Sequence, residues 1–324
     1  MDRSSALSRL RPAVMAFARR HPADRWCVGL SGGADSLALT AVAAAVKPTT
    51  ALIVDHGLQT GSADVAAAAA AQSRQLGCVD AQVICVSVGT DGGPEAAART
   101  ARYDALDAAR GGAPVLLAHT LDDQAETVLL GLGRGSGPRS IAGMRVWDPP
   151  WGRPFLDVRR ADTEAACAEL GLTPWQDPHN TDPRYTRVRL RAEVLPLLED
   201  VLAGGVAPAL ARTAAALRED NDALDALAAG YLAALRTDSV HGIAAGLTVA
   251  GLEDLPAALR RRVIRGWLLS VGATALTDVQ LRAVDALVGD WRGQGGAAVS
   301  SPLRYQRLVV TRRAGLLTVA ARPV

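Results

Sequence analysis

The chain has 324 residues, of which 49% are hydrophobic and 21% charged, and its formal net charge is +2. This length allows one or two globular domains with a substantial buried core. The balanced charge argues against a uniformly basic protein, so any contact with a polyanion would depend on local clusters of arginine.

The N-terminus and the cysteines indicate a reducing compartment. Five arginines within the first 20 residues interrupt any apolar signal region, and no uncharged stretch is long enough for a membrane span. The four cysteines form no CxxC pair, which argues against a zinc site. Cys27 and Cys85 lie in apolar runs and are expected to be small buried thiols. We therefore expect a cytoplasmic protein without a membrane segment.

In the first 135 residues, four apolar, strand-like segments are each followed by a helix-like segment. Strands are predicted at 26–30, 51–55, 81–88 and 114–118, and helices at about 35–46, 62–76, 94–110 and 122–132. This alternation predicts an α/β fold, a Rossmann-like parallel sheet with helices on both faces. Ligands of such sheets bind at the carboxyl ends of the strands.

The segment Ser31–Ser36, with sequence SGGADS, joins the first strand to its helix. Two glycines and two serines at a helix N-terminus bring N–H and O–H donors together, which suits a phosphate. Asp35 would repel phosphate unless a cation lay between them, so the segment predicts a nucleotide site that uses Mg²⁺. An ordinary glycine-serine turn with a capping aspartate is the alternative.

Three carboxylates follow the fourth strand in the segment His119–Glu126. Asp122 or Asp123 lies three or four residues before Glu126, so two carboxylates share one face of the first helical turn. Acidic residues there also stabilise a helix through its dipole, which is the simpler explanation. Beside a phosphate loop, such a cluster needs Mg²⁺ or a cationic substrate.

Other candidates lie near the same edge or on basic segments. Asp55 and His56 follow the second strand, and Arg99 and Arg102 share one face of the predicted helix at 94–110. A solvated helix face and a phosphate clamp both remain open for this arginine pair. The segment Arg184–Arg191 holds four arginines and a tyrosine, a pattern compatible with RNA as well as with a soluble surface.

Beyond about residue 134 the strand-helix pattern ends. Residues 134–200 are predicted to be mostly loops, the next 90 residues or so helical, and segments 304–310 and 316–321 a terminal hairpin. We place the domain boundary near 210, with a PP-loop type catalytic domain at 1–210, including a basic connecting segment at 184–210. A smaller, mainly helical domain follows at 211–324.

Taken together, these motifs resemble the N-type ATP pyrophosphatases and, within them, the tRNA(Ile)-lysidine synthetases. Ser31–Ser36 looks like the SGGxDS PP-loop of the first group. The other matching segments are Val54–Leu58, Ala98–Tyr103, His119–Thr127, Arg134–Gly137 with Gly143-Met144, and Arg153–Leu156 with Arg159. The sequence departs from the family pattern at Gln59, Gln176, His179 and Val188.

The resemblance implies a two-step ligase reaction. ATP adenylates C2 of the first anticodon cytidine of tRNA(Ile) with a CAU anticodon, and the ε-amine of free L-lysine then displaces AMP to form lysidine. The C-terminal domain would bind tRNA, and the oligomeric state is left open, a homodimer included. The alternatives are an ammonia-dependent synthetase or a tRNA thiolase of the same PP-loop group, or a tRNA-binding protein without activity.

The expected site residues fall into four groups. Catalysis is expected from Asp35, Asp123 and Glu126, and Mg²⁺ binding from Asp35 and Asp122. ATP contacts are expected at Ser31, Gly32, Gly33, Ala34, Asp35, Ser36, Asp55, His56, Arg99, Arg102, His119, Arg134 and Gly135. Contacts with tRNA are expected at Arg153, Arg159, Arg184, Arg187 and Arg191.

Overall fold

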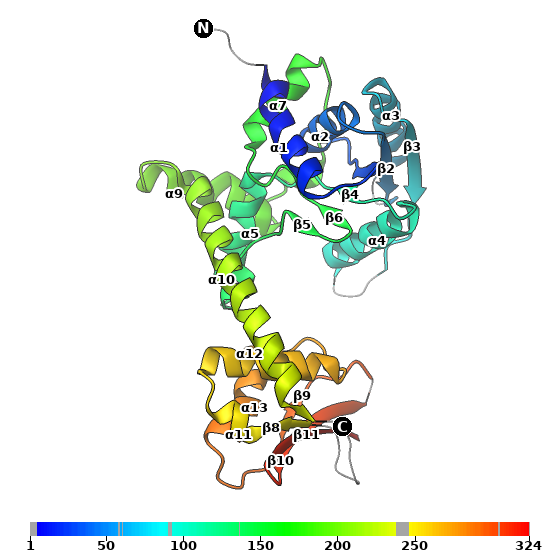
Figure 1. Ribbon diagram of the computed structural model, residues 1–324. Coiled ribbons are helices and arrows are strands. Elements are labelled where there is room, and N and C mark those ends of the chain that lie inside the picture. The colour runs from blue at the N-terminus through cyan, green and yellow to red at the C-terminus, as the bar shows by residue number, and fades with distance from the viewer. Residues whose placement is uncertain are drawn as a thin grey trace. The chain divides into compact units, whose positions relative to one another are not determined.

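The computed structural model describes residues 5–57, 59, 61–89, 93–135, 137–237, 246–303 and 305–323 (Figure 1). Leu58 and Ser136 of the motifs above, the side chain of His179, and Arg304 of the predicted hairpin lie outside the described part. The chain divides into two compact units, Met1–Ala215 and Ala216–Val324, and each is described by itself.

The first unit is built around a six-stranded sheet in the order β3-β2-β1-β4-β6-β5. Neighbouring strands are parallel except for β5, which runs antiparallel to β6 at the edge. The strands are β1 (Trp26–Gly29), β2 (Thr49–Asp55), β3 (Asp80–Cys85), β4 (Val115–Leu116), β5 (Trp147–Asp148) and β6 (Trp151–Gly152). The four predicted strands correspond to β1–β4.

Successive residues of the central strands pack into two different cores, because side chains alternate between the faces of a strand. Trp26 and Val28 of β1 lie in a core with α1, α2, α3 and α7, whereas Cys27 packs with Leu106 of α4. The helices are α1 (Ala6–Arg20), α2 (Ala34–Ala44), α3 (Ser62–Gln75), α4 (Pro94–Ala109), α5 (Leu121–Gly133) and α7 (Arg160–Glu169). The predicted α/β fold with helices on both faces is therefore confirmed.

One cysteine prediction is wrong. Cys27 is buried as expected, but Cys85 is exposed. The reason is the position of β3 at the edge of the sheet, where it pairs only with β2 and most of its side chains remain accessible. An apolar run alone does not distinguish an edge strand from a central one.

The segment predicted to be mostly loops contains further helices, of which α7 is the longest before residue 195. After α7 come η1 (Pro178–Thr181), α8 (Thr186–Arg189), the π-helical turn η2 (Leu190–Val194), α9 (Leu195–Val201) and the start of α10 (Val206–Leu235). The short helix α6 (Pro138–Ile141) follows α5. Glu199 accepts the N–H groups of Val206 and Ala207 at 3.0 Å each and so caps α10.

The second unit combines helices with a five-stranded antiparallel sheet in the order β7-β8-β11-β10-β9. The predicted hairpin is confirmed as β10 (Gln306–Arg313) and β11 (Leu316–Pro323), and it forms the middle of this sheet. Its other elements are β7 (Arg236–Thr237), β8 (Gly246–Thr248), α11 (Val249–Glu253), α12 (Ala257–Ser270), α13 (Asp278–Gly289) and β9 (Ala297–Val299). Trp267 of α12 and Val284 of α13 lie in its core.

Among the described residues, no single helix combines the length and the apolar character that crossing a membrane requires. One bent pair, Thr186–Val201 with Val206–Leu235, meets these criteria on length and composition alone.

Candidate active site

The site lies where the strand order reverses. β1 pairs in parallel with β2 on one side and with β4 on the other. The segments that follow these three strands therefore meet at the carboxyl ends of the strands. These segments carry Ser31–Ser36, Asp55-His56 and His119–Glu126, respectively. Crevices at such switch points are the usual ligand sites of open α/β sheets.

The loop after β1 is held by its own hydroxyl groups. The N–H of Ser31 donates to Ser36 Oγ at 3.2 Å, and that hydroxyl donates to the carbonyl of Gly33 at 2.9 Å. Gly32 has a φ of +82°, a conformation that favours glycine. Gly33 is the N-cap of α2 and has no side-chain cap, so no capping side chain takes up the first N–H groups of the helix. Such an N-terminus can accept a phosphate.

The acidic segment begins α5 with a capping box. Thr120 is the N-cap, and its N–H and hydroxyl both donate to Asp123 Oδ2 at 2.8 Å. Burial acts to raise the pKa of Asp123, but Arg160 and the Thr120 N–H outweigh it and hold that pKa below its ordinary value. Asp123 therefore both stabilises the helix and remains a carboxylate at neutral pH.

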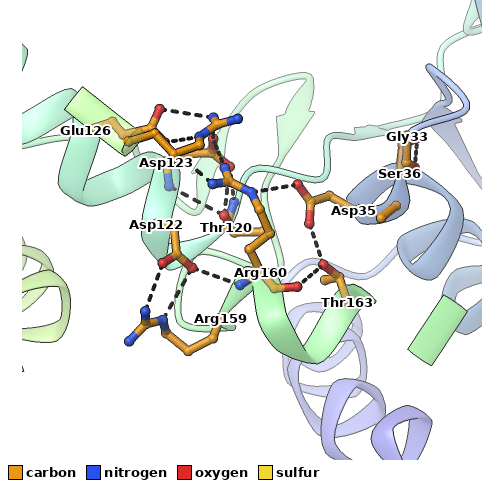
Figure 2. Close-up of polar contacts among 12 residues, drawn as sticks. Gly33, Asp35, Ser36, Thr120, Asp122, Asp123, Glu126, Arg159, Arg160 and Thr163 are labelled. Carbon is orange, nitrogen blue, oxygen red and sulfur yellow. Dashed lines mark hydrogen bonds and ion pairs between the residues drawn. The ribbon is translucent and has the colours of Figure 1, made fainter. Parts of the chain in front are cut away.

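Arg160 joins the two acidic segments (Figure 2). Its guanidinium lies 2.7 Å from Asp123 Oδ1, 3.4 Å from Asp35 Oδ2 and 3.5 Å from Glu126 Oε1. These carboxylates act to raise the pKa of Arg160 further and outweigh the opposing effect of its burial. The predicted catalytic residues are thus brought together by a residue absent from the prediction.

Three further contacts hold Asp122 and Asp35 in place. Arg159 Nη2 lies 3.0 Å from Asp122 Oδ1, and the backbone N–H of Arg160 donates to Asp122 Oδ2 at 2.8 Å. Thr163 donates its hydroxyl hydrogen bond to Asp35. Burial raises the pKa of Asp35, although Thr163 and Arg160 act against that rise. All three residues lie at the start of α7, which therefore serves as a support for the acidic cluster.

Glu126 is completely buried and receives a two-pronged ion pair. Arg191 Nε lies 2.8 Å from Oε1, and Arg191 Nη2 lies 3.2 Å from Oε2. Arg187 Nη1 is 3.9 Å from the same carboxylate and 3.4 Å from the Thr127 hydroxyl. Two arginines expected to contact tRNA thus contact the acidic cluster in this structure.

A second group of candidates contains His56, which follows β2, and His119, which follows β4, on either side of β1. Burial lowers the pKa of His119 to about 3, with Arg153 and Arg102 contributing, and burial with Arg102 also lowers the pKa of His56. Both imidazoles are therefore neutral at physiological pH. Within the described part of the chain, the buried Nδ1 atoms of His56 and His119 have no hydrogen-bond partner, which leaves polar atoms available for a ligand.

The other predicted positions differ in exposure. Arg99 is exposed and stacks over the ring of Tyr103, with 4.8 Å from Cζ to the centroid, whereas Arg102 is half-buried. Arg153 is only 6% exposed and donates to the carbonyl of Arg145, so its guanidinium is not displayed on the surface. Four other predicted positions make local contacts or are exposed. Asp55 accepts the N–H of Gly57, Arg184 pairs with Asp182, and Arg134 and Gly135 are exposed.

The carboxylates suit Mg²⁺ by their chemistry, since Mg²⁺ often binds through one or two carboxylates together with substrate phosphates. Asp35 belongs to the segment Ser31–Ser36 and lies in the first turn of α2, so it is the best placed of the predicted ligands. Asp122 is half-buried and paired with Arg159. In the described ranges, no group of three or more His, Cys, Asp or Glu residues forms a complete metal cage.

Comparison with known proteins assigns the two units to families. Residues 7–198 match the model of the PP-loop domain, and residues 247–313 match that of the TilS substrate binding domain. The chain is 67% identical to a tRNA(Ile)-lysidine synthase of Mycobacterium tuberculosis (strain ATCC 25618 / H37Rv) over the full length of both. It is 62% identical to a protein of that name from Nocardia farcinica, covering 96% of this chain and 97% of that one.

Among solved structures, the chain resembles a U34-tRNA thiolase from Methanococcus maripaludis with a TM-score of 0.54. The match covers 66% of this chain and 80% of the thiolase at 17% identity, so it supports the fold alone. The full-length relatives and the two domain matches together decide the family. The chain belongs to the tRNA(Ile)-lysidine synthase family and carries that family's PP-loop ATP-binding domain.

Proposed function

We propose that the protein adenylates C2 of the first anticodon cytidine of tRNA(Ile) and then joins that carbon to the ε-amine of free L-lysine. In the first step the C2 oxygen attacks the α-phosphorus of ATP and pyrophosphate leaves. In the second step the amine attacks C2, AMP leaves with the C2 oxygen, and the amine loses its proton. The product is lysidine.

For the first step, the loop Ser31–Ser36 would hold the departing pyrophosphate through its N–H and hydroxyl groups. The neutral imidazoles of His56 and His119, with their unpartnered Nδ1 atoms, and the nearby Arg99 and Arg102 would contact the rest of ATP. Mg²⁺ held by Asp35 and Asp122 would neutralise charge at the reacting phosphate.

For the second step, Asp123 and Glu126 would bind the lysine ammonium group. Only the neutral amine is a nucleophile, so a carboxylate or a water molecule that it holds must take the ammonium proton before the attack. Two adjacent carboxylates on one helical turn, both close to the PP-loop aspartate through Arg160, support this assignment.

The observation that carries the proposal is the meeting of a phosphate-binding loop and a buried carboxylate cluster at one sheet edge, in a chain of this family. A phosphate site alone would suit many nucleotide enzymes, but the carboxylates add a place for a cationic second substrate.

Exchange of labelled pyrophosphate into ATP tests the first step separately from lysine transfer. We expect exchange that requires tRNA(Ile) with a CAU anticodon and proceeds without lysine. Absence of exchange with any tRNA(Ile) transcript would refute catalysis by adenylation.

A further inference from the structure

The ion pair between Arg191 and Glu126 occupies the position at which a substrate cation is expected. The Glu126 side chain is 0% exposed, whereas that of Arg191 is 36% exposed. A buried carboxylate in a bidentate ion pair with an arginine already has its charge compensated and its hydrogen bonds made. Another cation can bind Glu126 fully only if Arg191 moves away.

The whole cluster is neutral without any ligand. Four carboxylates lie within ion-pair distance of four arginines, so the formal charges cancel. The members are Asp35, Asp122, Asp123 and Glu126 with Arg159, Arg160, Arg187 and Arg191. Cationic ligands would therefore compete with these arginines, whereas anionic ligands would compete with the carboxylates for them.

Arg187 and Arg191 are the members best placed to change partners. Their side chains are 43% and 36% exposed, compared with 19% for Arg160, so an RNA phosphate can reach them from solvent. They lie on α8 and on the π-helical turn η2, respectively. Single π-turns are rare and are frequently found at functional sites.

We infer that Arg191 occupies the lysine-binding carboxylate of the free protein and releases it when RNA phosphates engage Arg187 and Arg191. This inference rests on the proposed function. The lysine ammonium group then takes the place of the guanidinium on Glu126. Arg191 is thus a positioning residue that makes lysine binding depend on the RNA acceptor, and by linkage lysine strengthens RNA binding by the same factor.

The test is equilibrium dialysis of labelled L-lysine against the full chain, without ATP, with and without saturating tRNA(Ile) CAU transcript. In the wild type the transcript should tighten lysine binding about tenfold, within the usual range of coupling between sites. Arg191→Gln should bind lysine without the transcript about as tightly as the wild type does with it. The transcript should then add less than about a twofold effect.

Arg189→Gln is the matched control, because Arg189 lies two residues away and pairs with the exposed Glu193, not with the cluster. This control should keep the wild-type coupling. Arg191→Lys retains the charge but loses the bidentate contact, so the effect of the transcript on its lysine affinity should lie between those of the wild type and Arg191→Gln. This variant decides the test if Arg191→Gln does not fold.

Equal lysine affinity with and without transcript in the wild type would overturn the inference, as would wild-type coupling in Arg191→Gln or in Arg191→Lys. Transfer of labelled lysine to the transcript on addition of ATP is measured in the same samples. Failure of that transfer in the wild type refutes the proposed function, whereas transfer without coupling refutes only the role of Arg191.

Discussion

Arg160 Nη2 lies 2.7 Å from Asp123 Oδ1, and this contact joins the start of α7 to the start of α5. The same guanidinium reaches Asp35 at the start of α2. One side chain therefore compensates the charges of acids in the first turns of two helices, which follow different strands of the sheet. Without it, these acids would repel one another in a partly buried site.

Replacing Arg160 by methionine should lower the free energy of unfolding by about 2–3 kcal/mol, because it leaves buried carboxylates unpaired. Millimolar Mg²⁺ should raise the free energy of unfolding of Arg160→Met more than that of the wild type, since the cation can replace the missing positive charge. Urea unfolding with Mg²⁺ or with chelator measures both effects. Arg282→Met is the control, since it breaks an exposed ion pair with Asp278 and should cost less than about 1 kcal/mol. Equal responses of the two variants to Mg²⁺ would contradict the role given to Arg160.

Asp35 and Glu126 should affect different steps of the reaction. Asp35→Asn removes the charge beside the phosphate loop and should lower tRNA-dependent pyrophosphate exchange more than about 100-fold, with tRNA affinity nearly unchanged. Glu126→Gln should retain most of the exchange but lose lysine transfer to a similar extent. Exchange and transfer assays on both variants provide the comparison, and equal losses in both assays for Glu126→Gln would argue against separate roles.

The close contact between α5 and α6 depends on Gly131. A Cβ atom at this position would lie 2.1 Å from the carbonyl oxygen of Ser140, a backbone atom that cannot turn aside. Gly131→Ala should therefore destabilise the protein by about 1–3 kcal/mol. Gly133→Ala in the same helix meets nothing within 4 Å and should be neutral or stabilising by up to about 1 kcal/mol. Thermal unfolding of the two variants tests this, and equal effects would show that the packing is not tight at Gly131.

His119 should make the protein less stable in mild acid. Burial lowers the pKa of His119 to about 3 in the folded protein, whereas the ordinary value is 6.5. Between these values the unfolded chain binds a proton that the folded chain does not, so stability falls as the pH drops from about 6.5 toward 3. The slope from this residue is at most about 1.4 kcal/mol per pH unit. His119→Gln should flatten the dependence of the unfolding free energy on pH in this window, and an unchanged profile would exclude a buried neutral imidazole.

The central strands and the site loops were predictable because their signals are local. Each apolar run is followed at once by its polar or glycine-rich segment, and parallel pairing of β2, β1 and β4 brings these segments to one edge. This arrangement predicts that Asp35, Asp123 and Glu126 lie close together.

Arg160 was not predictable in the same way. Its neighbour Arg159 belongs to the predicted site, but the backbone of Arg159 is extended, with φ −76° and ψ 144°, so its side chain leaves the chain in a different direction. Arg159 is the N-cap of α7 and contacts Asp122, whereas Arg160 is the first helical residue and turns toward Asp35 and Asp123. This distinction requires the start of α7, a helix that was not predicted in its glycine- and proline-rich surroundings. An arginine in a first turn, against the helix dipole, was the available signal.

The second sheet was only partly predictable for a different reason. The hairpin β10–β11 has two strands of eight residues, whereas β7, β8 and β9 have two or three residues each. Strands that short show no alternation, and tertiary contacts decide how β9 pairs with β10, β8 with β11 and β7 with β8.

The most direct test of the account is transfer of labelled L-lysine to tRNA(Ile) in the presence of ATP and Mg²⁺. Two transcripts are compared, one with a CAU anticodon and one with uridine in place of the first anticodon cytidine. We predict label in the CAU transcript alone, released as lysidine after digestion. Label in both transcripts, or in neither, would contradict the proposal that the first anticodon cytidine is joined to lysine at this site.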